Sequence, residues 1–166
     1  VTQCPHCFST LKNDYAEMGI ELDVVHHSQF IDELIKENKI EPQPWVDEDV
    51  TFHDPCYLGR HNNEYDAPRS VLQSVLRDGK IKEMEKAKSE SFCCGAGGGN
   101  MWYEIKTGER INQNRVKQAV KTKANTVAAA CNFCNIMLED GVKTTQNEEN
   151  IKVLDIAEMV SKGLSQ

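Results

Sequence analysis

Seven cysteines are the residues of this chain whose type and spacing could do chemistry. Five of them form three groups: one cysteine at 56, an adjacent pair at 93–94 and a C-x-x-C pair at 131–134. Thirty-six residues separate each group from the next. Soft thiolates select zinc, copper(I) or iron–sulfur clusters. Adjacent cysteines chelate one small tetrahedral ion poorly but can bind two irons of a larger cluster, so the pattern favours a cluster.

Four glycines follow the adjacent cysteine pair in the segment "CCGAGGGN". A cluster lying against the backbone after Cys94 would collide with side chains there, whereas bare amides could donate N–H···S hydrogen bonds to it. The glycines predicted to contact this cofactor are Gly95, Gly97, Gly98 and Gly99. A nucleotide-binding loop is the competing interpretation. It is disfavoured because G-x-G-x-x-G needs a glycine where this chain has Asn100, and because no P-loop lysine follows.

Composition narrows the class of protein. The chain has 166 residues, of which 39% are hydrophobic and 27% charged, as is typical of a globular protein. A net charge of -7 argues against a nucleic-acid partner. No apolar run approaches the length of a membrane span, and no signal peptide is visible. An odd number of clustered cysteines then predicts metal or redox chemistry in a reducing compartment, which we expect to be the cytoplasm.

The elements that must position these cysteines alternate between strands and helices. This alternation predicts an α/β fold with a mostly parallel sheet flanked by helices. Strands are expected at residues 19–27, 50–56 and 125–131. Helices are expected at residues 28–39 with Ser28 as N-cap, at 66–79, at 101–124 with a break at Gly108, and from 131 to 142. A last strand and helix share residues 150–164.

An internal repeat sets the expected domain organisation. The segment "VTQCPHCFSTLKND" at 1–14 matches "AAACNFCNIMLEDG" at 128–141, and a similar strand and helix follow each copy. We interpret residues 1–38 as the end of a truncated first copy, 39–50 as a linker and 51–166 as a complete second copy. Two unrelated C-x-x-C helix starts are the alternative.

The cysteine pattern, together with "HDPCYLGRHNNEYDAPR", "FCCGAGGGNMWYE" and "VLDIAEM", resembles the cysteine-rich CCG domain found in the B-type and D-type polypeptides of heterodisulfide reductase and in related iron–sulfur oxidoreductases. Within that group the sequence is most similar to forms that pass electrons from electron-transferring flavoprotein to quinone. The resemblance implies a duplicated CCG-domain architecture and a noncubane 4Fe–4S cluster. The implied cluster ligands are Cys56, Cys93, Cys94, Cys131 and Cys134.

The same resemblance assigns Cys4 and Cys7 as the last two ligands of the first copy's cluster. Their partners are absent from this chain, so we expect that pair to be empty or to hold an ion such as zinc. Zinc is also the ion expected in a preparation that lacks the cluster. The implied partners are a redox protein such as electron-transferring flavoprotein and the rest of the same chain or complex. Contact with the inner face of the membrane is expected only through missing parts.

Histidines and charged residues near the motifs are further candidates for the site. His53, three residues before Cys56, is the candidate catalytic residue, as a proton relay or as a group that orients the cysteine loop. We expect the arginines at 60, 69 and 110 to be solvated, and the acids at 54, 104 and 140 to be caps or surface charges. Trp102 and Tyr103 are expected to pack in the core, and His6, His26 and His27 to satisfy local backbone groups.

The function predicted from these residues is electron transfer between a flavoprotein and a quinone pool within an iron–sulfur oxidoreductase. Two alternatives remain open from the sequence. The domain could be the catalytic part of a heterodisulfide (thiol–disulfide) reductase, or it could be a structural zinc or docking domain. Iron and acid-labile sulfide are expected only in the first two cases.

Overall fold

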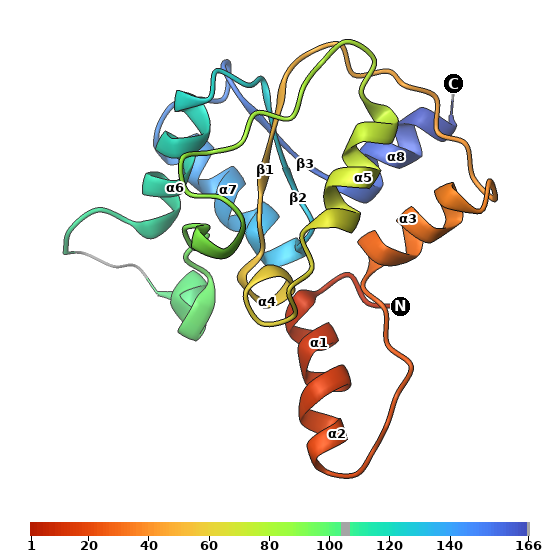
Figure 1. Ribbon diagram of the computed structural model, residues 1–166. Helices are drawn as coiled ribbons and strands as arrows, with labels where there is room; N and C mark the ends of the chain where they lie inside the picture. The colour runs from red at the N-terminus through yellow and green to blue at the C-terminus, as the bar shows by residue number, and fades with distance from the viewer. Residues whose placement is uncertain (104–106, 166) are drawn as a thin grey trace.

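The computed structural model describes residues 1–103 and 107–165. Its centre is a parallel sheet with the strand order β1-β2-β3, formed by β1 (Val50–His53), β2 (Thr126–Ala129) and β3 (Lys152–Asp155) (Figure 1). The register aligns Val50 with Thr126, and Thr126 with Lys152. All three strands therefore end at the same edge of the sheet, and the predicted α/β fold with a parallel sheet is confirmed.

Helices connect and cover the strands. Those at the ends of the chain and around the sheet are α1 (Pro5–Ser9), α2 (Tyr15–Glu17), α3 (His27–Lys36), α4 (Cys56–Gly59), α5 (Asp66–Val75), α6 (Ile111–Lys121), α7 (Asn132–Thr144) and α8 (Ile156–Leu164). A π-helical turn at Thr10–Asp14 joins α1 to α2, and 3-10 turns occupy Lys88–Glu90 and Gly97–Trp102.

Alternating side chains on the strands supply two separate cores. Val50, Phe52 and Ala128 pack with the apolar faces of α5 and α8. Val127 and Ala129 face the other way and pack with α6 and α7. Figure 1 shows these two helix pairs on opposite sides of the sheet. The strands are thus buried on both faces, as parallel strands usually are.

The N-terminal segment packs beside this domain without adding a strand to it. The strand predicted at residues 19–27 is wrong, because that segment pairs only through a bridge between Thr2 and His26 in the part of the chain that the structure describes. The predicted N-cap is also wrong, since His26 caps α3 in place of Ser28. Its Nδ1 accepts from the Ser28 N–H at 3.4 Å, and its own N–H donates to Gln29 Oε1 at 3.1 Å.

Two further expectations fail after the glycine segment. Trp102 and Tyr103 are 78% and 69% exposed, so the prediction that they pack in the core is wrong. The predicted helix at 101–124 is shorter, beginning at Ile111, after Gly108 with its φ of +75°. The expectation for Glu104 lies outside the described residues. Among the helices that the structure describes, none is both long and apolar enough to cross a membrane.

Candidate metal centre

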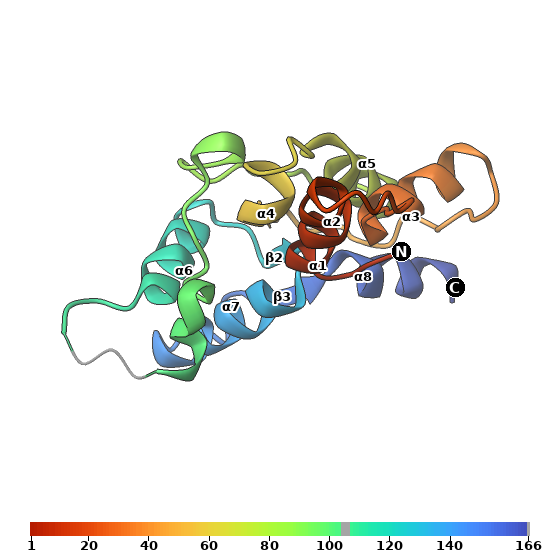
Figure 2. The same cartoon turned by 90° about the horizontal axis from the view of Figure 1, so that it is seen from below.

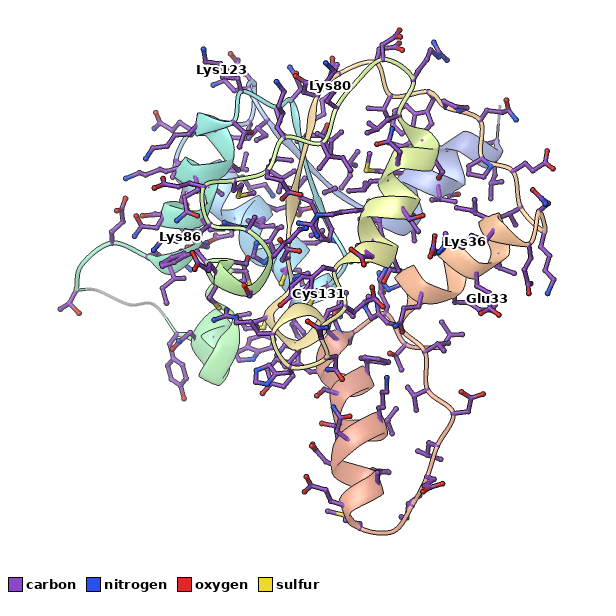
Figure 3. All side chains as sticks on the ribbon, in the orientation of Figure 1. Glu33, Lys36, Lys80, Lys86, Lys123 and Cys131 are labelled. Atoms are coloured by element: carbon purple, nitrogen blue, oxygen red, sulfur yellow. The ribbon has the colours of Figure 1, made fainter. Side chains whose placement is uncertain are left out.

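Three loops bring the five predicted ligands to the carboxyl edge of the sheet. Pro55 follows β1 in an extended conformation (φ -67°, ψ 131°) and starts α4 at Cys56. Cys131 follows β2 and is the N-cap of α7, which places Cys134 in the first turn of that helix. Figure 3 marks Cys131 at this edge of the sheet, close to α4. The loop before α6 supplies Cys93 and Cys94.

One hydrogen bond joins two of the five sulfurs directly, since the Cys134 thiol donates to Cys94 Sγ at 3.3 Å. All five are free thiols around one pocket, with Cys56 and Cys93 half-buried and the other three buried. The structure therefore brings together the five copy-two cysteines that the sequence assigned to one site.

Interactions among the thiols shift their pKa values in the metal-free protein. Hydrogen bonds from Cys56 and then Cys94 lower the pKa of Cys93, and the Gly95 N–H adds to this from 3.2 Å. The bond from Cys134 lowers the pKa of Cys131 in the same way. The pKa of Cys94 is pulled down by Cys134, but Cys93 and burial outweigh that bond and raise it to about 12. The thiols therefore differ in acidity, with the pKa of Cys93 and Cys131 lowered and that of Cys94 raised.

The glycine segment meets this pocket at one position. Gly97 is exposed and lines the cysteine pocket, and a Cβ there would meet no protein atom within 4 Å, so the pocket is open at this position. Gly95, Gly98 and Gly99 have φ values of +94°, +65° and +75°, which disfavour L side chains whatever the space. An open pocket lined by five sulfur donors fits an iron–sulfur cluster.

His53 lies behind the sulfurs at the end of β1 and is 1% exposed. One of its ring nitrogens, Cys94 Sγ and Cys134 Sγ all lie within 4.8 Å of one another. Burial, and then the charge of Arg115, lowers the pKa of His53 well below its usual value, so the ring is neutral. Its Nδ1 accepts a hydrogen bond from Arg115 Nε at 2.9 Å.

Arg115 is the residue near the site that reasoning from the sequence missed. It is fully buried, and Asn112, Val116 and Ala119 share its face of α6. An arginine at helical spacing among small and apolar residues is the signal that could have found it, because lone charges are rarely buried on such a face.

Two expectations for charged residues need correction. Asp54 is neither a cap nor a surface charge: it is 3% exposed, accepts from both Nη atoms of Arg69 at 2.8 and 3.0 Å, and accepts the Lys88 N–H at 2.8 Å. Arg69 is accordingly a half-buried ion-pair partner, and it also bonds to Glu83. Asp140 and Arg110 are both half-buried and pair with each other at 3.0 Å, whereas Arg60 is exposed.

The N-terminal C-x-x-C turn lies against the mouth of this pocket. His6 lines the pocket, and its ring centroid is 4.1 Å from that of Tyr57 and 5.9 Å from that of Phe133. His6 is therefore more than a partner for local backbone. Cys4 is half-buried, and its pKa is raised by burial and, to a smaller extent, by the charge of Cys131. Cys7 is exposed. Figure 2 shows α1 beside α4, in front of the carboxyl ends of the strands.

Comparisons with known proteins agree with this geometry. The chain is 40% identical over 164 residues to "Probable iron-sulfur-binding oxidoreductase FadF" of Bacillus subtilis, covering 99% of this chain and 23% of that protein. It is 41% identical over 171 residues to "EtfAB:quinone oxidoreductase" of Syntrophomonas wolfei, covering 99% and 24%. It is 38% identical over 164 residues to one polypeptide of the dihydromethanophenazine:CoB–CoM heterodisulfide reductase of Methanosarcina barkeri, covering 97% and 39%.

The chain thus spans about a quarter of the length of the first two relatives. A family model described as "CCG: Cysteine-rich domain" matches residues 50–139, the part of the chain that carries β1, β2 and all five clustered cysteines. The chain therefore belongs to the CCG cysteine-rich domain family, and two of these relatives are named oxidoreductases.

Proposed function

We propose that this domain holds a noncubane 4Fe–4S cluster and passes electrons between a flavoprotein and a quinone pool. The observation that carries the proposal is the convergence of five cysteines, contributed by three loops, on one pocket. Five ligands exceed the four that a structural zinc ion takes. When bound, the cluster would accept and return single electrons.

The residues of this chain would hold and tune that group. Cys56, Cys93, Cys94, Cys131 and Cys134 would be its ligands. Gly97 would leave room for it, and the Gly95 N–H, which donates to Cys93 Sγ at 3.2 Å, would stabilise negative charge on that sulfur. Because the Gly95 N–H is a backbone group in a packed loop, it needs little reorganisation when the charge of the site changes.

The partner we propose is an electron-transferring flavoprotein. The relative from Syntrophomonas wolfei is named "EtfAB:quinone oxidoreductase", and this chain matches a quarter of it at 41% identity. Contact with quinone and membrane would then involve other parts of a longer protein. We propose the cytoplasmic face of the membrane as its location, since seven free thiols persist best in a reducing compartment.

The N-terminal segment has a separate proposed role. We propose that residues 1–38 are the end of a first CCG copy, joined by residues 39–50 to the second copy at 51–166. Cys4 and Cys7 would then be the last ligands of a first cluster, or would bind zinc where that cluster's other ligands are lacking. The shared placement of Cys4 and Cys131 as helix N-caps supports this interpretation.

Heterodisulfide reduction is the second candidate function. It is favoured by the 38% identity to part of a heterodisulfide reductase and by the half-buried Cys56 and Cys93, which leave one side of the cysteine pocket open to a substrate. Turnover with a heterodisulfide by the full-length protein, and none with a flavoprotein, would favour this candidate over the first.

The test is to measure iron, acid-labile sulfide and zinc in anaerobically purified protein, with EPR spectra of the oxidised sample. We expect about four irons and four sulfides per chain and a paramagnetic oxidised state. One zinc and no sulfide would overturn the proposal and leave a structural zinc or docking domain. A Cys56→Ser variant serves as control, because it removes a ligand from the most exposed loop and should lower iron content without unfolding the domain.

A further inference from the structure

Arg115 is a buried cation whose hydrogen-bond partners, in the part of the chain that the structure describes, are all neutral groups. Its side chain is fully buried between α6 and the sheet. Its partners are His53 Nδ1 at 2.9 Å, the Lys86 carbonyl at 2.9 Å, Gln118 Oε1 at 2.8 Å and Ser91 Oγ at 3.2 Å. Burial lowers the pKa of Arg115 to about 10, which still leaves it protonated at neutral pH.

Arg69, on the other side of the sheet, shows how this protein ordinarily compensates an enclosed guanidinium. Arg69 is 14% exposed and bonds two carboxylates, Asp54 at 2.8 Å and Glu83 at 2.7 Å. Burying a charge costs several kcal/mol unless an opposite charge is near. Arg115 has no such bond to a carboxylate among the described residues, so its compensation must come from charges that it does not touch.

Asp54 is the main negative charge that acts on Arg115 through space, followed by the Cys134 and Cys94 sulfurs where these are ionised, and by Glu83. Asp54 is already paired with Arg69, at 2.8 Å. The two sulfurs lie within 4.8 Å of one nitrogen of the His53 ring that Arg115 bonds. As thiolate ligands of the proposed cluster, they would be the negative groups on which Arg115 acts through His53.

The bond between Arg115 and His53 fixes the position of the imidazole proton. A guanidinium has only donors, so His53 Nδ1 must be the acceptor. A neutral imidazole with an accepting Nδ1 carries its proton on Nε2. The ring therefore carries an N–H donor, rather than a lone pair, on the nitrogen that Arg115 leaves free, and one of its two nitrogens lies within 4.8 Å of Cys94 Sγ and Cys134 Sγ.

We propose that Arg115 is a positioning residue that holds His53 in the Nε2–H tautomer beside the Cys94 and Cys134 sulfurs and supplies a fixed positive charge behind the ring. His53 is then neither a metal ligand nor a relay that accepts protons through Nδ1. N–H···S bonds and nearby positive charge stabilise the more negative form of an iron–sulfur site. This inference rests on the proposed cluster for its redox consequence, but the imidazole tautomer is a property of the metal-free protein as well.

The first part of the test is ¹⁵N NMR of the His53 ring in the wild-type apo protein. We expect the Nε2–H tautomer, with Nδ1 unprotonated, at neutral pH. An Nδ1–H tautomer or a rapidly exchanging mixture would overturn the inference. This measurement needs neither cluster nor variant, so it decides the tautomer even if the protein takes up no iron and the proposed function fails.

The second part is the midpoint potential of cluster-loaded Arg115→Met and Arg115→Lys. Arg115→Met removes the positive charge and the hydrogen-bond donor to His53. It should therefore shift the midpoint potential to more negative values and leave the His53 tautomer unfixed. Arg115→Lys keeps a cation and should recover part of the shift. If Arg115→Met fails to fold, Arg115→Lys still reports, since a potential equal to that of wild type together with a released tautomer would overturn the redox role of the fixed His53 tautomer.

Arg69→Met is the matched control. It also removes an enclosed guanidinium, but one whose charge Asp54 and Glu83 already neutralise. We expect it to lower the stability of the domain while leaving the potential and the His53 tautomer unchanged. An equal shift of potential in the Arg69 and Arg115 variants would mean that the effect is structural loosening, and would overturn the inference.

Discussion

Two C-x-x-C turns, each followed by a helix, occupy different environments in this protein. In both, the first cysteine is an extended N-cap and the second lies in the first helical turn. Cys131 and Cys134 are 1% and 3% exposed and line one pocket with three other cysteines. Cys4 is half-buried, and Cys7 is exposed. The local sequence is therefore enough to present two thiols, but a metal centre also needs the loops that converge on them.

The segments that follow the two turns end in similar helix caps but differ in strand pairing. His26 caps α3 with Gln29 in a reciprocal capping box, and Asp155 caps α8 with Glu158 in the same arrangement. The Thr2–His26 bridge is placed like the pairing of Ala129 with Asp155. The second segment continues as a paired strand because β2 lies beside it, whereas the first has a single bridge.

The largest effect should come from removing one cysteine from each turn. Cys134→Ser removes a buried ligand from the cysteine pocket, and we expect iron and sulfide content to fall to near zero. Cys7→Ser removes an exposed thiol, and we expect about four irons per chain to remain. Parallel iron and sulfide assays on both variants check this. Equal losses would mean that the N-terminal turn is part of the same centre.

Gly97 of the glycine segment lines one pocket with Cys131 and Cys134 of the second C-x-x-C turn, and Gly97→Val tests whether that segment leaves room for a cluster. The valine side chain would stand in the cysteine pocket, so we expect strongly reduced cluster loading with the apo fold retained. Iron content and circular dichroism measure the two parts of this result. Gly19→Val is the control. Gly19 has a φ of +81° but lies outside the pocket, so its replacement should cost about 1–2 kcal/mol of stability and leave loading unchanged. Full loading of Gly97→Val would remove the steric argument.

The helical segments that follow the two turns differ in packing at Gly141 and at Asp14, which occupies the matching position of the first segment. A Cβ at Gly141 would lie 2.8 Å from Val116 Cγ2 and 3.0 Å from the Asn112 carbonyl of α6. Overpacking of this kind costs roughly 1–3 kcal/mol, and the helix propensity of alanine returns about 1 kcal/mol. We therefore expect Gly141→Ala to lower the free energy of unfolding.

The control for this prediction is Asp14→Ala, since Asp14 is exposed in the π-helical turn. Its substitution should stay within about 0.5 kcal/mol. Urea unfolding of the apo proteins compares the two. A Gly141→Ala variant more stable than wild type would show that α6 and α7 can separate slightly at no cost.

The smallest effect concerns the two caps and their pH dependence. Burial, and then the neighbouring charge of His27, lowers the pKa of His26 to about 3. Burial raises the pKa of Asp155, but His27 and the Ala157 N–H outweigh it and lower that pKa. A depressed folded-state pKa gives stability that is present above the unfolded pKa and lost as the pH falls. The His26 contribution should therefore disappear between pH 6.5 and about 3, and that of Asp155 only below 3.8.

Urea unfolding of the apo protein from pH 7 to pH 5 measures the His26 part of this window. One proton contributes a slope of at most about 1.4 kcal/mol per pH unit. His26→Asn keeps a capping oxygen but has no titrating ring, so it should flatten the slope. An unchanged slope would assign the pH dependence to other buried histidines.

Much of this protein could be predicted from its sequence by itself. The gaps between Cys56, the 93–94 pair and the 131–134 pair predicted one site built from three loops, and alternating strands and helices predicted the parallel sheet. These predictions succeed because they depend on local periodicity and on the chemistry of thiol groups. The structure brings the five cysteines to one pocket, as that pattern required.

Only the tertiary structure decided which charges meet. The sequence does not specify that Asp54 and Glu83 neutralise Arg69, or that Arg115 bonds His53 beside the sulfurs. The strand expected at 19–27 failed for the same physical reason, because a strand needs a hydrogen-bonding neighbour that its own residues do not specify. Contacts between residues far apart in the sequence determine the burial of the two arginines, the tautomer of His53 and the pairing of strands. The spacing of the cysteines along the chain determines which metal ligands are available.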